Sequence, residues 1–136
     1  MSARSKARKR ALDLVYAAEI HGRSATEWLD EQVATGDGPT NEYTSELVRG
    51  LDAHRERIDG LISSYSRDWS LERMPAVDRN VLRLGIFELL YVDDVPDAVA
   101  VSEAVNLVRD LSTDESPAFV NGVLGNIARD KAELTA

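Results

Sequence analysis

The stretch that decides the fold is VDRNVLRLGIFELLYV, residues 77–92. From Val81 to Val92 the only charged side chains are Arg83 and Glu88, so a helix formed here is apolar on nearly every side. In a soluble protein, a helix that is apolar all round lies in the core. We therefore expect this helix to run through the centre of the fold, with Arg83 and Glu88 in structural roles such as pairing across helices.

Two helices are predicted before residue 40. In the first, Ser2 can act as the N-cap, and Gly22 can end the helix in the left-handed conformation. A shorter helix starts near Ser24 and Thr26 and ends at Gly36. The apolar stripe of the first helix has the spacing of one helical face and consists of Ala7, Ala11, Leu14 and Ala18.

A third helical pattern begins at about Asn41 and continues past residue 60. Gly50 and Gly60 weaken it and are expected to mark a bend. Residues 66–75 are expected to be irregular, because Pro75 cannot sit inside a helix without the loss of a hydrogen bond. Trp69 is expected to cover the core there.

The C-terminal third predicts two more helices. The first opens after Pro96. In the last, Ser116 is the expected cap and Pro117 the first helical residue. Small residues follow one face of this last helix, and their expected use is close helix packing: Ala118, Gly122 and Gly125. No stretch predicts a strand.

Composition sets the class of protein. The chain has 136 residues, of which 43% are hydrophobic and none is cysteine. This length suits one all-α domain with a core of its own, and the absence of cysteine fits a reducing cytoplasm. The longest apolar run, Leu14 to Ala18, has five residues, far below the roughly 20 that span a bilayer. The basic N-terminus lacks the apolar segment of a secretory signal.

Charge divides the chain into a basic arm and an acidic body. The net charge is −8, yet the first ten residues hold five cations and no acid: Arg4, Lys6, Arg8, Lys9 and Arg10. The other 126 residues carry eleven basic and 24 acidic side chains, a net charge of −13. This asymmetry indicates an anionic partner at one end and leaves room for a cationic partner elsewhere. Cations oppose the macrodipole at a helix N-terminus, so we expect the arm, residues 1–10, to fray alone and to order on phosphate. A solvated tail is the alternative.

Catalytic and cofactor-binding patterns are missing. The two histidines, His21 and His54, lack the spacing of a zinc site, and no glycine-rich phosphate loop occurs. His21 is expected to cap a helix and His54 to be exposed. We interpret the chain as a non-enzyme without cofactor or metal.

Four separated segments together resemble the NusB family of bacterial transcription antitermination factors. They are RKRALDLVY at 8–16, VDRNVLRLGIFELL at 77–90, DVP at 94–96 running into VSEAVNL at 101–107, and FVNGVL at 119–124. The resemblance covers nearly the whole chain and is weakest between residues 24 and 66. It implies about seven helices that form two helical subdomains of one domain, residues 1–136.

The resemblance also implies a function, which is binding of boxA in nascent ribosomal RNA together with the ribosomal protein NusE. That complex joins RNA polymerase and suppresses termination. Position by position, it assigns RNA binding to the arm cations and to Tyr16, Phe119 and Glu115, where the acid modulates affinity. It assigns Asp78 to the NusE interface. The residues alone favour core positions for Tyr16 and Phe119, which lie beside apolar positions.

Two other functions stay open from the sequence. One is a helical protein-interaction module whose basic tail only keeps it soluble. The other is the RNA-binding domain of an RNA methyltransferase, although no catalytic domain follows up to Ala136. Family members occur as monomers and as homodimers, and the sequence leaves this choice open.

Overall fold

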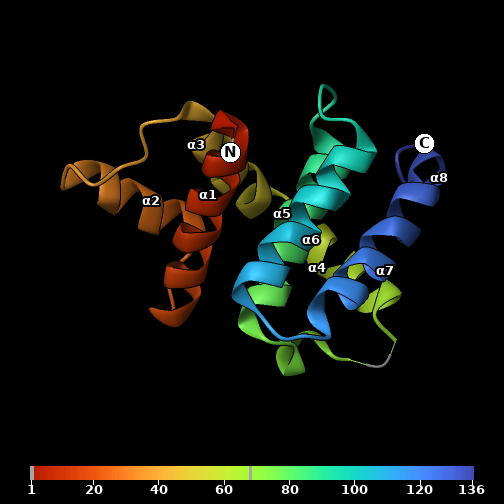
Figure 1. Ribbon diagram of the computed structural model, residues 1–136. Helices are drawn as coiled ribbons and strands as arrows, with labels where there is room; N and C mark the ends of the chain where they lie inside the picture. The colour runs from red at the N-terminus through yellow and green to blue at the C-terminus, as the bar shows by residue number, and fades with distance from the viewer. Residues whose placement is uncertain (1, 68) are drawn as a thin grey trace. The chain divides into compact units, whose positions relative to one another are not determined.

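Every regular element of this protein is helical in the part of the chain that the computed structural model describes, residues 2–67 and 69–136 (Figure 1). The helices form two compact units, one up to His54 and one from Arg55 onward. The expectation of an all-α fold is confirmed. Within the described ranges, no helix combines the length and apolar character that crossing a membrane requires.

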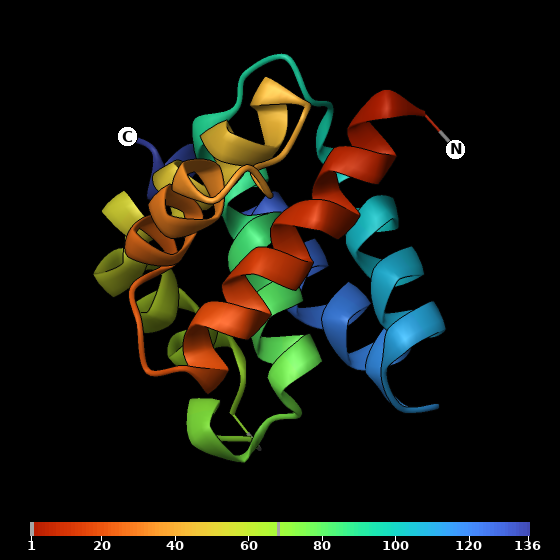
Figure 2. The ribbon, with the colours of Figure 1, turned by 90° about the vertical axis from the view of Figure 1, so that its left-hand side faces the viewer.

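Three helices make up the N-terminal unit: α1 (Ala3–Ile20), α2 (Ala25–Ala34) and α3 (Glu42–Ala53). Each packs against the other two, and Figure 2 shows α1 as the longest of them. Ser2, Ser24 and Asn41 cap the three helices by accepting a backbone N–H from the first turn. Gly22 and Gly36 have φ values of +65° and +87°, so both predicted glycine stops are confirmed.

The basic N-terminal segment is helical from Ala3 onward rather than frayed. Ser2 Oγ accepts the Ser5 N–H at 3.0 Å, and the Arg4 guanidinium lies 4.2 Å from the centre of the Tyr43 ring. The cap and this cation–π contact oppose the unfavourable interaction between the cations and the helix dipole. The expected fraying is therefore not seen.

The C-terminal unit contains α4 (Arg55–Tyr65), a 3-10 turn η1 (Leu71–Arg73), α5 (Ala76–Tyr91), α6 (Asp97–Leu111), α7 (Ser116–Arg129) and the short α8 (Lys131–Leu134). As predicted, α5 is the central helix, because it packs against α4, α6 and α7 and is buried at nearly every position from residue 78 to 90. Arg83 Nε donates to Asp59 Oδ1 of α4 at 2.7 Å, which confirms a structural pairing across helices for Arg83. Glu88 is buried on the same helix.

Three local predictions were wrong. The long third pattern is broken at His54, with Gly50 and Gly60 both inside helices, because the residues before and after the break belong to different units. Ser116 is the first residue of α7 rather than its cap, and its hydroxyl is engaged inside the fold. The small-residue strip on α7, which was expected to pack closely against another helix, is exposed, and Cβ atoms added at Gly122 and Gly125 would meet nothing within 4 Å.

Close helix packing occurs at Gly85 of α5 instead. A Cβ added there would lie 2.7 Å from Leu124 Cδ1 of α7 and 3.6 Å from Ala104 Cβ of α6. The missing side chain therefore lets three helices of this unit approach one another.

Candidate nucleic-acid interface

One face of α1 presents cations and an aromatic ring to solvent. Its five residues, spaced by three and four, are all exposed: Lys6, Lys9, Asp13, Tyr16 and Ile20. Tyr16 is 36% exposed, which is unusual for a large ring beside an apolar stripe. Residues at these spacings are neighbours on a helix surface, so the two lysines and the ring form one strip of about three turns.

The arginines at positions 4 and 8 lie on another side of α1. Arg4 is half-buried over the Tyr43 ring of α3, and Arg8 is only 5% exposed with its guanidinium 5.9 Å from the same ring. A buried guanidinium cannot reach a solvent-borne phosphate without a rearrangement. The expectation that Arg8 is a surface phosphate contact is therefore corrected, and the arm does not act as a uniform set of five cations.

Arg10 and Lys6 border a shallow groove of about 450 Å³ between α1 and residues 38–41. Arg10 Nη2 donates to the Asp37 carbonyl at 2.9 Å, and Asn41 Nδ2 donates to the Ala3 carbonyl at 3.4 Å. These bonds tie the loop to α1. Lys9 lies on the strip that also holds Tyr16. Lys6 and Lys9 are exposed, and the half-buried Arg10 lines the groove, so these three are the cations of the arm with the best access to a phosphate.

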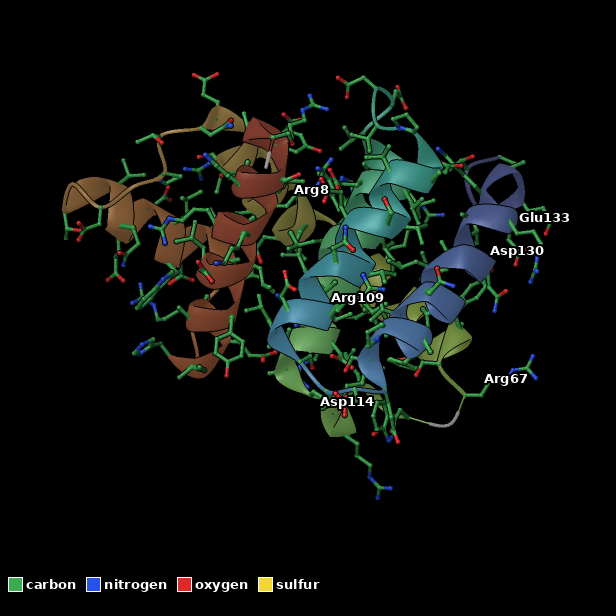
Figure 3. The ribbon with its side chains drawn as sticks, in the orientation of Figure 1. Arg8, Arg67, Arg109, Asp114, Asp130 and Glu133 are labelled. Atoms are coloured by element: carbon green, nitrogen blue, oxygen red, sulfur yellow. The ribbon has the colours of Figure 1, made fainter. Side chains whose placement is uncertain are left out.

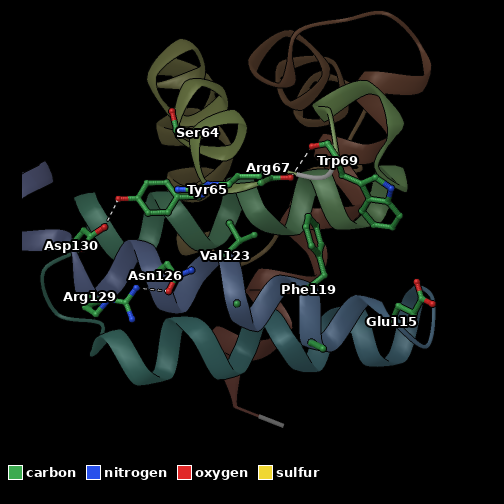
Figure 4. Close-up of a pocket in the computed structure, with 13 residues that line it drawn as sticks. Ser64, Tyr65, Arg67, Trp69, Glu115, Phe119, Val123, Asn126, Arg129 and Asp130 are labelled. Carbon is green, nitrogen blue, oxygen red and sulfur yellow. Dashed lines mark hydrogen bonds between the residues drawn. The ribbon is translucent and has the colours of Figure 1, made fainter.

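The C-terminal unit holds a second feature, an open cleft of about 940 Å³ between α7 and the segment after α4 (Figure 4). Phe119 is half-buried, and its ring meets Trp69 edge to face with centroids 5.2 Å apart. Glu115 is exposed at the same end of α7. The cleft lining comprises Ser64, Tyr65, Ser66, Arg67, Trp69, Glu115, Ala118, Phe119, Gly122, Val123, Asn126, Arg129 and Asp130.

Hydrogen bonds fix the far end of this cleft. Tyr65 Oη donates to Asp130 Oδ2 at 2.7 Å, and Arg129 Nη2 donates to Asn126 Oδ1 at 2.7 Å. The hydrogen bond to the Asp130 carboxylate raises the pKa of Tyr65 above its usual value near 10, and partial burial of the phenol raises it further. Arg67 extends into solvent from the segment after α4 (Figure 3).

Asp78 does not lie on a surface. Its side chain is fully buried, and its two carboxylate oxygens accept hydrogen bonds from Ser112 Oγ at 2.6 Å and Ser116 Oγ at 2.8 Å. Ser116 Oγ also accepts the Thr113 N–H at 3.2 Å. The expectation that Asp78 contacts a partner protein is corrected, because this carboxylate fixes the turn between α6 and α7.

Sequence reasoning missed most of the cleft. Trp69 was expected to cover the core and is half-buried, but it also lines the opening together with Tyr65. The available signal was a tryptophan in a short polar segment outside a regular helix, where no apolar periodicity accounts for it, four residues after the tyrosine that ends α4. His21 caps α1 as expected and stacks on Trp28 at 4.5 Å, and His54 is exposed. Within the described residues, no group of three or more His, Asp or Glu side chains is placed to hold a metal ion.

Comparison with known proteins identifies the family. Residues 5–129 match the NusB family. The chain is 67% identical to a transcription antitermination protein NusB from Nocardioides sp., over 98% of this chain and 99% of that protein, and 56% identical to the one from Beutenbergia cavernae, over 95% and 91%.

Solved structures agree with this match. The fold superposes on T. maritima NusB with a TM-score of 0.85 at 33% identity, covering 96% of this chain and 94% of the other. It also superposes on a chain from a crystal structure of antitermination factors NusB and NusE in complex with double-stranded RNA, with a TM-score of 0.79 at 30% identity, covering 93% and 96%. Matches over nearly the full length in both sequence and fold leave one conclusion: this chain belongs to the NusB family.

Proposed function

We propose that this protein is a transcription antitermination factor that binds boxA of nascent ribosomal RNA together with NusE and acts in the RNA polymerase complex. Its relatives carry transcription antitermination in their names, and one structural relative was solved with NusE and double-stranded RNA. The observation that carries the RNA-binding part is the exposed strip on α1, in which Lys6, Lys9 and Tyr16 lie on one helix face.

The chemistry of this strip suits single-stranded RNA. Lysine and arginine neutralise phosphates, and an exposed aromatic ring stacks on unpaired bases of any sequence. Lys6, Lys9 and Arg10 offer up to three phosphate contacts, and Tyr16 lies about two turns beyond Lys9 and Arg10 along the helix. Glu115, an exposed acid, would repel phosphate and so limit affinity.

Salt dependence tests this assignment. Each phosphate contact with a single strand contributes about −0.7 to the slope of log affinity against log salt. Replacing Lys6, Lys9 and Arg10 by alanine should flatten the slope by about 2 and weaken binding to boxA and scrambled RNA alike. A matched control removes three exposed arginines elsewhere, namely Arg49, Arg73 and Arg109. The control lowers the net charge by the same amount and should leave the slope within a few tenths of the wild-type value.

The outcomes separate the candidate functions. A slope that changes only in the α1 variant supports phosphate tracking by this face. Equal slopes in the two variants would show that only overall charge matters, and no binding of boxA RNA by the wild type would favour a protein-interaction module. Alanine is a better helix former than lysine, so far-UV circular dichroism should show no loss of helix in the α1 variant.

The partner proposals rest on charge. Outside the first ten residues the chain carries a net charge of −13, which suits a cationic protein such as one that itself binds RNA.

Light scattering of the chain alone, with RNA and with NusE measures whether it is a monomer or a homodimer and whether the complex holds one copy of each. Asp78→Lys is unsuitable as an interface test, because it places an ammonium group in a fully buried site.

A further inference from the structure

We propose that the start of α3 holds the first two turns of α1 in helical form and thereby sets the affinity of this protein for RNA. Tyr43 is the central positioning residue, and Arg4 and Arg8 act through its ring rather than on the RNA. This inference rests on the proposed function and concerns the N-terminal unit alone. It adds residues that contribute to RNA binding without contact with the RNA.

The Tyr43 ring is the first argument. It is buried, and the guanidinium carbons of Arg4 and Arg8 lie 4.2 and 5.9 Å from its centre. Residues four apart lie on one side of a helix, so the ring contacts two successive turns of α1. A guanidinium keeps its charge when buried and stacks on aromatic faces, whereas an ammonium group is more strongly hydrated. These two arginines therefore lie on the side of α1 that faces α3, while Lys6 and Lys9 are exposed.

Hydrogen bonds to the same two turns are the second argument. Asn41 Nδ2 donates to the Ala3 carbonyl at 3.4 Å, and Thr44 Oγ1 donates to the Ala7 carbonyl at 3.1 Å. Thr44 is fully buried, so loss of this bond would leave its hydroxyl unsatisfied. Asn41, Tyr43 and Thr44, which we call the α3 brace, thus fix the first and second turns of α1 from one side.

The charge of the arm gives the α3 brace its role. Cations in the first turn of a helix oppose its dipole, and the first ten residues contain five cations and no acid. Without tertiary contacts, a helix end of this composition frays. A partly frayed arm binds RNA more weakly in proportion to the fraction that is helical, because only the helical arm presents Lys6 and Lys9 in line with Tyr16. The α3 brace therefore raises affinity through order that is present before RNA binds.

Two substitutions of Tyr43 test the α3 brace without any change of charge. Tyr43→Leu removes the aromatic face and keeps an apolar side chain in the site, so affinity for single-stranded boxA RNA should fall by about three- to tenfold. Tyr43→Phe keeps the aromatic face and should bind within about twofold of wild type. Amide hydrogen exchange of residues 6–10, measured without RNA, should be faster than in wild type for Tyr43→Leu and unchanged for Tyr43→Phe.

Leu51→Ala is the control for a general loss of stability. Leu51 is fully buried on α3, about two turns beyond Tyr43, and is not part of the α3 brace. Its truncation should lower the midpoint of urea unfolding. RNA affinity should nevertheless stay within about twofold of wild type, because the folded fraction remains near one, which circular dichroism checks. Exchange at residues 6–10 should also be unchanged.

A second pair of variants separates a positioning arginine from a contacting lysine. Arg8→Gln and Lys9→Gln each remove one positive charge, at neighbouring positions of α1. Loss of one phosphate contact flattens the slope of log affinity against log salt by about 0.7, which is the result expected for Lys9→Gln. Arg8→Gln should lower affinity as Tyr43→Leu does, yet keep the slope within about 0.2 of wild type, because the helical arm still contacts the same phosphates.

Each outcome decides the proposal. Wild-type affinity in Tyr43→Leu, or an equal loss in Leu51→Ala, would overturn the role of the α3 brace and leave the proposed function intact, since the wild-type protein still binds boxA. An equal loss in Tyr43→Phe would show that the aromatic face is not what matters and would also overturn it. The same holds if the slope flattens as much in Arg8→Gln as in Lys9→Gln, because Arg8 would then contact phosphate. Absence of RNA binding by the wild-type protein would instead refute the proposed function, on which this inference rests.

Discussion

Asp78→Ala tests whether the Asp78 carboxylate is a buried acceptor that holds the turn between α6 and α7, rather than a surface group. The variant removes the acceptor of two hydrogen bonds, from Ser112 at 2.6 Å and from Ser116 at 2.8 Å. A hydrogen bond to a charged group is worth about 1.5–3 kcal/mol. The two serine hydroxyls can still bond to each other at 3.1 Å, and Ser112 is partly exposed to water. The expected loss is therefore about 2–4 kcal/mol of unfolding free energy, below the simple sum.

The assay is urea unfolding followed by Trp69 fluorescence in a Trp28→Phe background, because Trp69 reports the unit that holds Asp78. In thermal unfolding, at about 4 °C per kcal/mol, the melting temperature should fall by roughly 8–16 °C. Asp114→Ala is the matched control, an exposed aspartate in the same turn, with an expected change below about 1 kcal/mol. If Asp78→Ala is no less stable than Asp114→Ala, the buried network does not hold this turn.

Two further predictions concern helix packing and a tyrosine. Gly85→Val should destabilise the C-terminal unit by about 1–3 kcal/mol in urea unfolding, because its Cβ would lie 2.7 Å from Leu124 Cδ1; an unchanged midpoint would contradict the close approach of α5 and α7. The raised pKa of Tyr65 favours the neutral phenol in the folded state, so its contribution to stability is complete below the unfolded pKa of about 10 and is lost as pH rises through the folded value. Asp130→Asn should move the titration of Tyr65 to lower pH. The titration is measured by tyrosinate absorbance and is identified as that of Tyr65 by its loss in Tyr65→Phe. An unmoved titration would mean that the hydrogen bond does not cause the pKa shift.

The sequence by itself determined the helices and most of their ends. Apolar periodicity reports which face of a helix is buried, and capping residues and glycine stops act within a few residues of chain. This is why Ser2, Gly22, Gly36 and the apolar stretch of α5 were predicted correctly. The same local information identified the cations of the arm as candidates for binding an anion.

Only the tertiary structure decided which of the candidate residues face solvent. Arg8 and Lys9 are neighbours in sequence, yet Arg8 is buried near Tyr43 and Lys9 is exposed, because successive helix positions point about 100° apart. Asp78 became a buried acceptor through two serines more than 30 residues away. Gly85 is close-packed and Gly122 is open because α5 is surrounded and α7 has a free side. Such contacts depend on which segments distant in sequence lie opposite a side chain, and no local pattern contains that information.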